Sequence, residues 1–459
     1  MKEELLQFIW RYQYFNQHEL LSESGEPVQV VCPGELNTDQ GPDFLHAQVR
    51  IGATLLAGAV ELHIVASNWQ KHAHDGDIHY RNVILHVVWE NDRPVRDHPV
   101  DPTQLPGEGI TVSKVGPGRV DDIPMLVLQH RIPKLLLGQY ERWMKSRDFI
   151  PCHRQLAAVD QQLWTRWKQQ LLIQRLQKRT QYIATYLDAN RHNWEETTWW
   201  LLARNFGLPV NTVAFESIGK SLPLRLLARY RGDLFRMEAL LLGQAGLLET
   251  NSRQRSEYRH LLQREWKYLR ALHHLSPIQT SLRFFRMRPA HFPTLRLAQL
   301  AALLSEHPAW FGAIRDAASP LELEAWLGVA TSEYWQTHYL LSTALGKEDG
   351  APGPGKQKGR SGRLGKQIKN SLLINTFVPL LFAYGQLRNE PAFCKKAVRW
   401  LEEAGPERNS VLSRWESLGA ANKSAADSQA LLELKNGYCQ LRKCLSCGIG
   451  NRLLGRIDR

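Results

Sequence analysis

Hydrophobic residues in the first hundred positions change from a helical spacing to a strand-like alternation. Apolar residues recur at the interval of an α-helix from Leu5 to Tyr12, which predicts an amphipathic helix over 4–15. Apolar and polar residues then alternate with a period of two, as is typical of half-buried strands. The strand-like runs are 27–31, 47–51, 60–64 and 83–89. The predicted order is a helix, three strands, a loop or helix over 68–82, and a further strand.

The rest of the pattern is mostly helical and is interrupted by two stretches rich in glycine and proline. The stretch 92–125 is typical of a linker, and the basic stretch 347–365 predicts a mobile loop. We therefore expect an α+β protein, in which a mixed α/β N-terminal domain precedes a mostly α-helical region. The expected parts are an α/β domain over 1–125, a helical domain over 126–346, the loop 347–365 and a C-terminal helical segment over 366–459.

Composition and charge narrow the class of protein. The chain has 459 residues, of which 43% are hydrophobic and 22% charged, as is typical of a folded soluble protein. It contains no apolar run near the roughly 18 residues that a membrane span needs, and its charged start is unlike a secretory signal, so we expect a cytoplasmic protein. The net charge of +13 favours nucleic acid as a partner, with a surplus of charge for solubility as the alternative. The sequence does not indicate a protein partner.

Acidic residues and histidines are concentrated on the predicted strands. Six of the 17 histidines lie between residues 46 and 86. Glu61 and His63 are two positions apart on a strand, so they share a face at a spacing of about 7 Å. Asp43 follows a Gly-Pro turn signal and comes beside Glu61 if the strands pair as a meander. Two adjacent carboxylates suit a hard divalent cation such as Mg²⁺ or Mn²⁺.

The pattern Pro42-Asp43 followed by Glu61-Leu62-His63 resembles that of the PD-(D/E)xK nuclease superfamily. The resemblance implies a core of helix, three strands, helix and strand, which agrees with the predicted order. It implies that Asp43 and Glu61 hold the metal, and that His63 replaces the lysine that activates water or stabilises developing charge. Lys71 could reach back from the next loop to supply that charge. The implied activity is that of a metal-dependent nuclease, a hydrolase acting on DNA or RNA.

Other interpretations of this segment stay open. A β-domain with a polar face and hydrogen-bonded histidines would have the same pattern. His72, His74 and Asp75, joined by His63, would suit a transition metal such as Zn, Mn or Fe. Glu35 is a candidate for an upstream acid. Because lysine is missing at position 63, one alternative function is a non-catalytic nucleic-acid-binding protein with a degenerate nuclease site. Another is a helical interaction or scaffold protein that presents tryptophan-rich surfaces.

Segments along the whole chain resemble an uncharacterised bacterial family, a domain of unknown function. The segments that carry this resemblance are 37–44, 58–63, 82–88, 288–296 and the terminal cysteine segment. Together they imply that the resemblance covers most of the chain. The family has no established activity. The resemblance therefore indicates that most of the chain belongs to one family, more than it indicates any function.

A segment in the second half of the chain interleaves arginines with aromatic residues. The arginines are Arg283, Arg286, Arg288 and Arg296, and the aromatic residues are Phe284, Phe285 and Phe292. Guanidinium groups and aromatic faces suit phosphate contact and base stacking, which makes this segment a candidate nucleic-acid-binding surface. An irregular connection with buried aromatics and solvated arginines is the alternative.

Three of the six cysteines lie close together near the C-terminus. Cys444 and Cys447 have the spacing of a metal knuckle, and Cys439 adds a third thiol. The candidates for a fourth ligand are Cys394, the nearest, and then Cys152 and Cys32. A complete Cys₄ site would hold zinc or an iron–sulfur cluster, and some nucleases of the resembled superfamily carry such a cluster. Buried thiols without a metal are the alternative.

Overall fold

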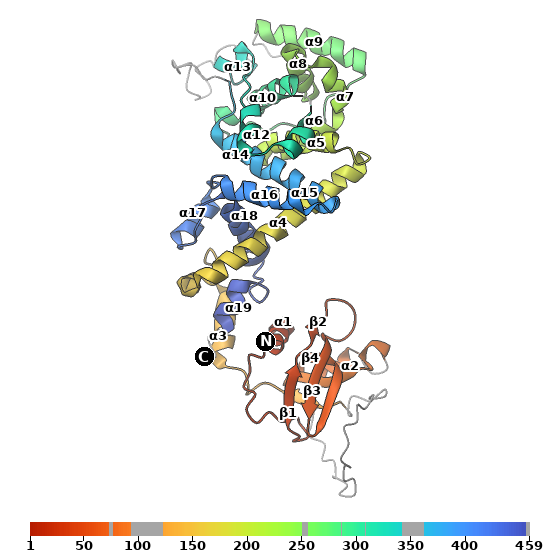
Figure 1. Ribbon diagram of the computed structural model, residues 1–459, viewed down its shortest axis with the longest axis vertical. Helices are drawn as coiled ribbons and strands as arrows, with labels where there is room; N and C mark the ends of the chain where they lie inside the picture. Colours follow the sequence, from red (N-terminus) through yellow and green to blue (C-terminus); the bar gives the residue numbers. More distant parts are fainter. Residues whose placement is uncertain are drawn as a thin grey trace. The chain divides into compact units, whose positions relative to one another are not determined.

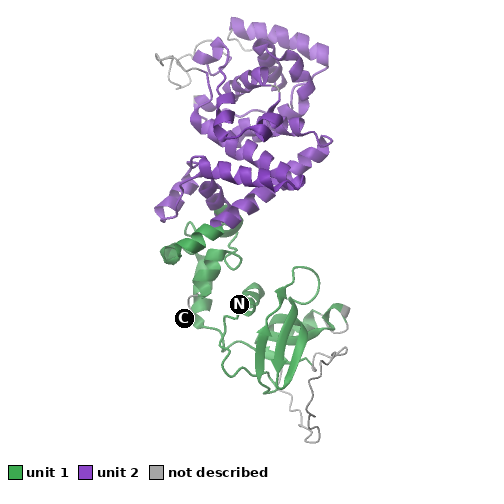
Figure 2. Cartoon of the chain, viewed as in Figure 1, with its two compact units in different colours: residues 1–167, 435–459 green, residues 168–434 purple. Residues whose placement is uncertain are grey.

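The computed structural model describes residues 1–72, 77–92, 123–249, 256–285, 287–307, 309–341 and 362–455 (Figure 1). The chain forms two compact units, of which unit 1 is residues 1–167 with 435–459 and unit 2 is residues 168–434 (Figure 2). The predicted α+β class is confirmed, because unit 1 contains a sheet and unit 2 is helical. Most of the two stretches rich in glycine and proline lies outside the described residues.

Unit 1 begins with the predicted amphipathic helix α1 (Glu3–Tyr12). Its apolar face, which includes Leu6 and Ile9, is fully buried. The helix ends at Tyr12, and the next residue, Gln13, caps it in the left-handed conformation. The acidic residues of its first turn suit the positive end of the helix dipole.

The sheet of unit 1 has six strands among the described residues. They are β1 (Val28–Cys32), β2 (Glu35–Leu36), β3 (Phe44–Ile51), β4 (Thr54–Val65), β5 (Val83–Glu90) and β6 (Met125–Val127). The order is β1-β3-β4-β5-β6, with β2 paired to β3; β4, β5 and β6 are parallel, and the other pairs are antiparallel. The predicted strands correspond to β1, β3, β4 and β5. The other two are too short to show a period of two.

Strand β4 is covered on both faces, although the alternation predicted one apolar and one polar face. Leu62 is 0% exposed, and Glu61 and His63 on the opposite face are only 6% and 1% exposed. Helices α1 and α2 (Asn68–Lys71) both pack on β4. After α2, the 3₁₀ turn η1 (Ile78–Tyr80) leads into β5, which agrees with the predicted helix between these strands. The acidic and histidine side chains are therefore enclosed.

The C-terminal residues fold back onto the first part of the chain. After α3 (Lys134–Lys145), η3 (His153–Ala158) and the start of α4 (Gln161–Ala189), unit 1 is completed by the end of the π-helix η7 (Leu434–Cys439) and by α19 (Gly448–Gly455). The Arg442 guanidinium donates to the Trp143 carbonyl at 2.8 Å, and Lys435 donates to the Phe149 carbonyl at 2.6 Å. These long-range contacts place residues 435–459 in unit 1. The units therefore divide the chain after residues 167 and 434, and not at the expected boundaries 125, 346 and 365.

Unit 2 begins at Lys168 with the rest of α4, and further helices and short helical turns follow. They are α5 (Trp194–Phe206), α6 (Leu208–Ser221), α7 (Leu224–Leu227), η4 (Ala228–Tyr230), α8 (Leu234–Gln244), α9 (Glu257–His273), η5 (Pro289–His291), α10 (Pro293–Glu306), α11 (Trp310–Asp316), α12 (Pro320–Trp326), α13 (Glu333–Thr337), α14 (Lys366–Leu372), the π-helix η6 (Leu373–Phe377), α15 (Val378–Leu387), α16 (Pro391–Glu403), α17 (Ser410–Ser417) and α18 (Ala425–Glu433). Its core contains tryptophans that are at most 2% exposed, namely Trp199, Trp266, Trp310, Trp335, Trp400 and Trp415. Within the described residues, no helix combines the length and the apolar character needed to cross a membrane.

Candidate functional site

The pairing of β3 with β4 brings Asp43 beside Glu61. Phe44 lies opposite Val60 in the antiparallel register, so the preceding Asp43 reaches the level of Glu61. The Asp43 N–H donates to Glu61 Oε2 at 3.0 Å, and the Leu62 N–H donates to Asp43 Oδ2 at 2.9 Å. The two carboxyl groups that the sequence suggested as metal ligands therefore lie together.

Burial and mutual repulsion make both carboxyl groups hold protons unusually tightly. Burial raises the pKa of Asp43 to about 6, against the hydrogen bonds from Leu62 and Gln7, which favour the charged form. Burial, followed by the charge of Asp43, raises the pKa of Glu61 to about 8. At neutral pH the pair therefore holds a proton, which a divalent cation would have to displace.

Helix α1 adds two polar side chains to this site. Gln7 Nε2 donates to Asp43 Oδ1 at 2.7 Å. Glu3, one helical turn earlier, lies close enough for its charge to raise the pKa of both Asp43 and Glu61, and burial raises the pKa of Glu3 itself. The upstream acid at this site is thus Glu3, whereas Glu35 is exposed on β2. The interval of four between Glu3 and Gln7, which puts both on one face of the helix, was the available signal.

Three histidine rings form a chain beside the carboxyl groups. His63 Nδ1 lies 3.0 Å from His86 Nε2, and His63 Nε2 lies 3.2 Å from His72 Nδ1 and 3.5 Å from Glu61 Oε1. The register of the parallel pair β4–β5 sets His86 opposite Glu61. His63 and His86 are buried, whereas His72 is exposed. The imidazole chain therefore links the enclosed site to solvent.

Lys71 does not take the position expected of a catalytic lysine. Its ammonium lies 3.4 Å from Asn68 Oδ1, and its charge helps to lower the pKa of Asp92, after the hydrogen bonds from Ser67. The side chain is exposed because α2 ends at this residue. Two other residues of the histidine-rich alternative, His74 and Asp75, lie outside the described residues.

Aromatic side chains close the site around the histidines. The Trp69 ring packs against His63 and His86, with centroid distances of 6.2 and 4.9 Å. Burial, followed by the charges of Glu61 and Asp43, raises the pKa of Tyr80 to about 12, so the Tyr80 hydroxyl stays protonated beside the acids. Across the described ranges, no three side chains from His, Cys, Asp and Glu are already arranged as a metal-ligand set.

The cysteines fall into a cluster of four and two separate residues. Cys152, Cys439, Cys444 and Cys447 interact electrostatically with one another in unit 1, and burial raises the pKa of each thiol. Cys394, the fourth ligand expected from the sequence, is instead on α16 in unit 2, where its Sγ lies 3.5 Å from the Phe382 carbonyl oxygen. Cys32 is exposed on β1. The fourth member of the cluster is therefore Cys152.

The arginine-rich segment divides into exposed and buried parts. Arg283 and Arg288 are exposed, and Phe285 between them is 81% exposed. Arg296 is only 4% exposed because it lies on the buried helix α10, where it donates to Gln299 Oε1 at 2.8 Å. The prediction of Arg296 as a surface contact for nucleic acid is therefore wrong. Arg286 lies outside the described residues.

Unit 2 contains a cavity of about 350 Å³ lined by cationic side chains. The cations are Arg175, Lys178, Arg179 and Arg204, and the acid among the lining residues is Glu433. Arg175 and Lys178 pair with Glu433, and Arg204 pairs with Glu216. Arg179 instead donates to the Ile374 carbonyl at 3.2 Å and to Asn375 Oδ1 at 2.7 Å, both neutral acceptors on η6. Burial, followed by the charge of Arg175, lowers the pKa of Arg179 to about 9.

Comparison with known proteins gives a family without an assigned activity. The sequence profile of a family described as "Protein of unknown function (DUF2851)" matches residues 3–410. The match includes Glu3, Asp43, Glu61 and Cys152, and it ends before the terminal cysteine segment. No curated protein and no solved structure matches the chain.

Proposed function

Because the chain belongs to the DUF2851 family, whose description names no activity, we propose from geometry that unit 1 is a divalent-cation-dependent nuclease of the PD-(D/E)xK type. The observation that carries the proposal is the convergence of Asp43 and Glu61 across β3 and β4. Buried, adjacent carboxylates repel each other, and a hard cation would relieve that repulsion.

The donor set fits Mg²⁺ or Mn²⁺. Asp43 and Glu61 would hold the ion, and Glu3 would add a third carboxylate or bind one of its water ligands. When bound, such an ion lowers the pKa of a coordinated water and polarises a phosphodiester. Gln7 supports the site by fixing one oxygen of Asp43 with its amide.

His63 would take over part of the role that lysine has in the PD-(D/E)xK superfamily. Its Nε2 lies 3.5 Å from Glu61 Oε1 and 3.2 Å from the exposed His72. Both contacts use the same nitrogen, so Nε2 of a neutral His63 could accept a proton from Glu61 and then pass that proton to Nδ1 of His72, which leads from the buried acids to solvent. Unlike lysine, His63 carries a charge only below its pKa, which makes the proposed activity dependent on pH.

The test is cleavage of plasmid DNA, single-stranded DNA and RNA by the purified full-length chain with Mg²⁺ or Mn²⁺. We expect cleavage that is abolished in Asp43→Asn and in Glu61→Gln and retained in Asp39→Asn, which removes an exposed acid from the preceding turn. Cleavage that persists in both site variants would overturn the assignment. Absence of cleavage by the wild-type chain with every substrate and ion would overturn the proposed activity.

Nucleic-acid binding without cleavage is a second candidate, which the cationic cavity of unit 2 favours. Arg175 lies about one turn before Lys178 and Arg179 on α4. The hydrogen-bond acceptors of Arg179 are neutral, and the acids that act on its charge, Glu407 and Glu433, do so without a hydrogen bond, so a phosphate could form a charge-assisted hydrogen bond with this guanidinium. Nucleic-acid binding should weaken steeply as the salt concentration rises. In Arg179→Gln or Lys178→Gln, the slope of the logarithm of the binding constant against the logarithm of the salt concentration should be smaller in magnitude by about one. Arg399→Gln, an exposed change on α16, is the control. Equal slopes in all variants would exclude the cavity as the binding site.

A further inference from the structure

We propose that Cys152, Cys439, Cys444 and Cys447 form a tetrathiolate site in unit 1 for a thiophilic metal centre, either Zn²⁺ or an iron–sulfur cluster. The site is separate from the acidic site on β3 and β4, and it does not depend on the proposed nuclease activity. Four thiolates in one place are the donor set of closed, structural zinc sites and of iron–sulfur clusters.

The cluster is assembled by the fold and not by local sequence. Cys152 precedes η3, Cys439 ends η7, and Cys444 and Cys447 precede α19. Cys439 lies within electrostatic range of the other three thiols, and Cys152 lies within range of Cys444 and Cys447. Cys152, Cys444 and Cys447 are only 8%, 7% and 6% exposed. Residues nearly three hundred positions apart are thus brought into the same part of unit 1.

The backbone between Cys444 and α19 forms a tight turn around a thiol. The Cys447 N–H donates to the Cys444 carbonyl at 3.3 Å, and the N–H groups of Ile449 and Gly450 interact favourably with the Cys447 thiolate. A Cβ atom at Gly450 would lie 2.2 Å from the Cys444 carbonyl oxygen, so this close approach requires glycine. Backbone N–H groups directed at a ligand sulfur are the outer-shell support that metal thiolates need.

A buried indole nitrogen next to the cluster lacks an acceptor. Trp167 is only 7% exposed, and among the described residues its Nε1 has no hydrogen-bond partner. The same indole interacts favourably with the thiolate form of Cys447. A buried N–H without an acceptor is unfavourable, and a metal-bound thiolate of Cys447 would supply one. A buried N–H beside Cys447 therefore supports a charged sulfur at this position.

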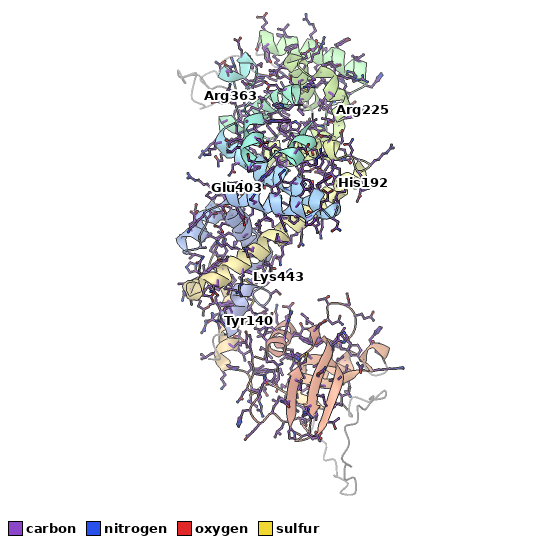
Figure 3. The ribbon with its side chains drawn as sticks, viewed as in Figure 1. Tyr140, His192, Arg225, Arg363, Glu403 and Lys443 are labelled. Atoms are coloured by element: carbon purple, nitrogen blue, oxygen red, sulfur yellow. The ribbon has the colours of Figure 1, made fainter. Side chains whose placement is uncertain are left out.

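Cationic groups are placed to offset the negative charge of four thiolates. Lys435 acts on Cys439 and Arg442 acts on Cys444, and each charge favours the thiolate form. Tyr140 on α3 also interacts electrostatically with Cys444, and Figure 3 labels Tyr140 and Lys443, the neighbour of Cys444. Among the residues that the structure describes, the four thiols are not arranged as a metal-ligand set. Metal binding would therefore draw the four sulfurs together by side-chain rotation.

The proposed centre would fasten the C-terminal segment to the first part of the chain. Residues 435–459 belong to unit 1 although residues 168–434 form another unit. Arg442 and Lys435 already attach this segment to the carbonyls of Trp143 and Phe149. A metal joining Cys152 to three cysteines of the terminal segment would close the same junction with four further bonds.

The decisive experiment measures the metal content of the full-length chain purified without oxygen or chelators. We expect about one zinc per chain, or iron with acid-labile sulfide and visible absorption, and these two results distinguish the two centres. Cys152→Ser and Cys444→Ser should lose the metal, whereas Cys394→Ser and Cys32→Ser should keep it. The double variant Asp43→Asn with Glu61→Gln should also keep it, which separates this proposal from the nuclease proposal.

If the cysteine variants fail to fold, a second measurement on the wild-type chain still tests the proposal. In the wild-type chain, alkylation followed by mass spectrometry should modify Cys32 readily, since it is exposed, and spare the four clustered thiols until the metal is removed by a chelator. Metal in less than about a tenth of the chains would overturn the proposal, as would equal loss of metal in Cys394→Ser and Cys152→Ser.

Discussion

The backbone N–H of Asp43 donates a hydrogen bond to Oε2 of Glu61 over 3.0 Å, so the strand pairing itself fixes the distance between the two acids. The reciprocal bond from the Leu62 N–H to Asp43 Oδ2 holds the second carboxyl group in place. The acids therefore cannot move apart to relieve their repulsion without breaking these two hydrogen bonds. This constraint gives the site a dependence on pH and on cations that can be measured.

Unit 1 should lose stability as pH rises when no divalent cation is present. Both carboxyl groups bind protons more tightly in the folded chain, with pKa values raised from 3.8 to about 6 for Asp43 and from 4.5 to about 8 for Glu61. Their stabilising contribution is complete below about pH 4 and disappears as pH rises through 6 and 8. Calorimetry in EDTA should show the melting temperature of unit 1 falling over this range, and Mn²⁺ should restore it most at high pH.

The Glu61→Gln variant tests the cause of this pH dependence. It should raise the stability of unit 1 at about pH 9 in EDTA by about 1–2 kcal/mol, because it removes a buried negative charge. It should also flatten the pH profile and abolish the effect of Mn²⁺. Asp39→Asn, at an exposed position, should leave the profile unchanged. A Glu61→Gln profile as steep as that of the wild type would show that another group titrates.

Glu3 should behave as a member of the acidic site although it lies on α1. Its charge raises the pKa of Asp43 and Glu61. In Glu3→Gln, the melting temperature of unit 1 in EDTA should therefore begin to fall at a lower pH than in the wild type. It should also weaken Mn²⁺ binding about tenfold, as loss of a supporting group does at metal sites. Glu35→Gln, on the exposed strand β2, is the matched control. Isothermal titration calorimetry with Mn²⁺ at a fixed pH compares the two variants. Equal Mn²⁺ affinities of Glu3→Gln and Glu35→Gln would show that Glu3 is not part of the site.

His63 should affect turnover more than cation binding. If it transfers protons through His72, then His63→Gln should lower the rate of cleavage about a hundredfold and leave the affinity for Mn²⁺ nearly unchanged. His72→Gln should have a smaller effect, because that ring lies at the exposed end of the chain of histidines. His79→Gln, which replaces an exposed histidine on η1, should change neither the rate of cleavage nor the affinity for Mn²⁺. Loss of Mn²⁺ affinity without loss of turnover would instead identify His63 as a ligand.

Periodicity was sufficient to predict the elements that position the acidic site. Alternation located β3 and β4, and pairing two neighbouring strands in the sheet is enough to bring Asp43 to Glu61. The predicted polar face of β4 was misjudged because its burial depends on α1 and α2, which pack on it from separate segments. Strands β2 and β6 contain two and three residues, which is too few for any periodic signal.

Long-range contacts account for what the sequence could not predict. Cys152 joins Cys439, Cys444 and Cys447 through tertiary folding, whereas nearness in sequence favoured Cys394. Arg296 ends the same arginine-rich segment as the exposed Arg283 and Arg288, yet it lies on a helix that is buried on nearly every side. Spacing along the chain carries no information about either outcome.

The junction between α5 and α11 in unit 2 depends on the carboxylate of Glu195. Its Oε2 accepts the N–H groups of Trp310 and Phe311 at 2.8 and 2.9 Å, and its Oε1 accepts that of Gly312 at 3.0 Å. These N–H groups open α11 and have no partner within the helix, so a residue more than one hundred positions away serves as the cap.

Replacing this cap should therefore destabilise unit 2. Glu195→Gln keeps one acceptor but removes the charge that interacts with the helix dipole, and should lower the free energy of unfolding by about 1–2 kcal/mol. Glu195→Ala should cost about 2–3 kcal/mol, because three buried N–H groups lose their acceptors. Denaturant unfolding of the full-length chain measures both, with Glu402→Gln on the exposed face of α16 as the control. A Glu195→Ala chain as stable as the Glu402→Gln chain would show that water satisfies the end of α11 equally well.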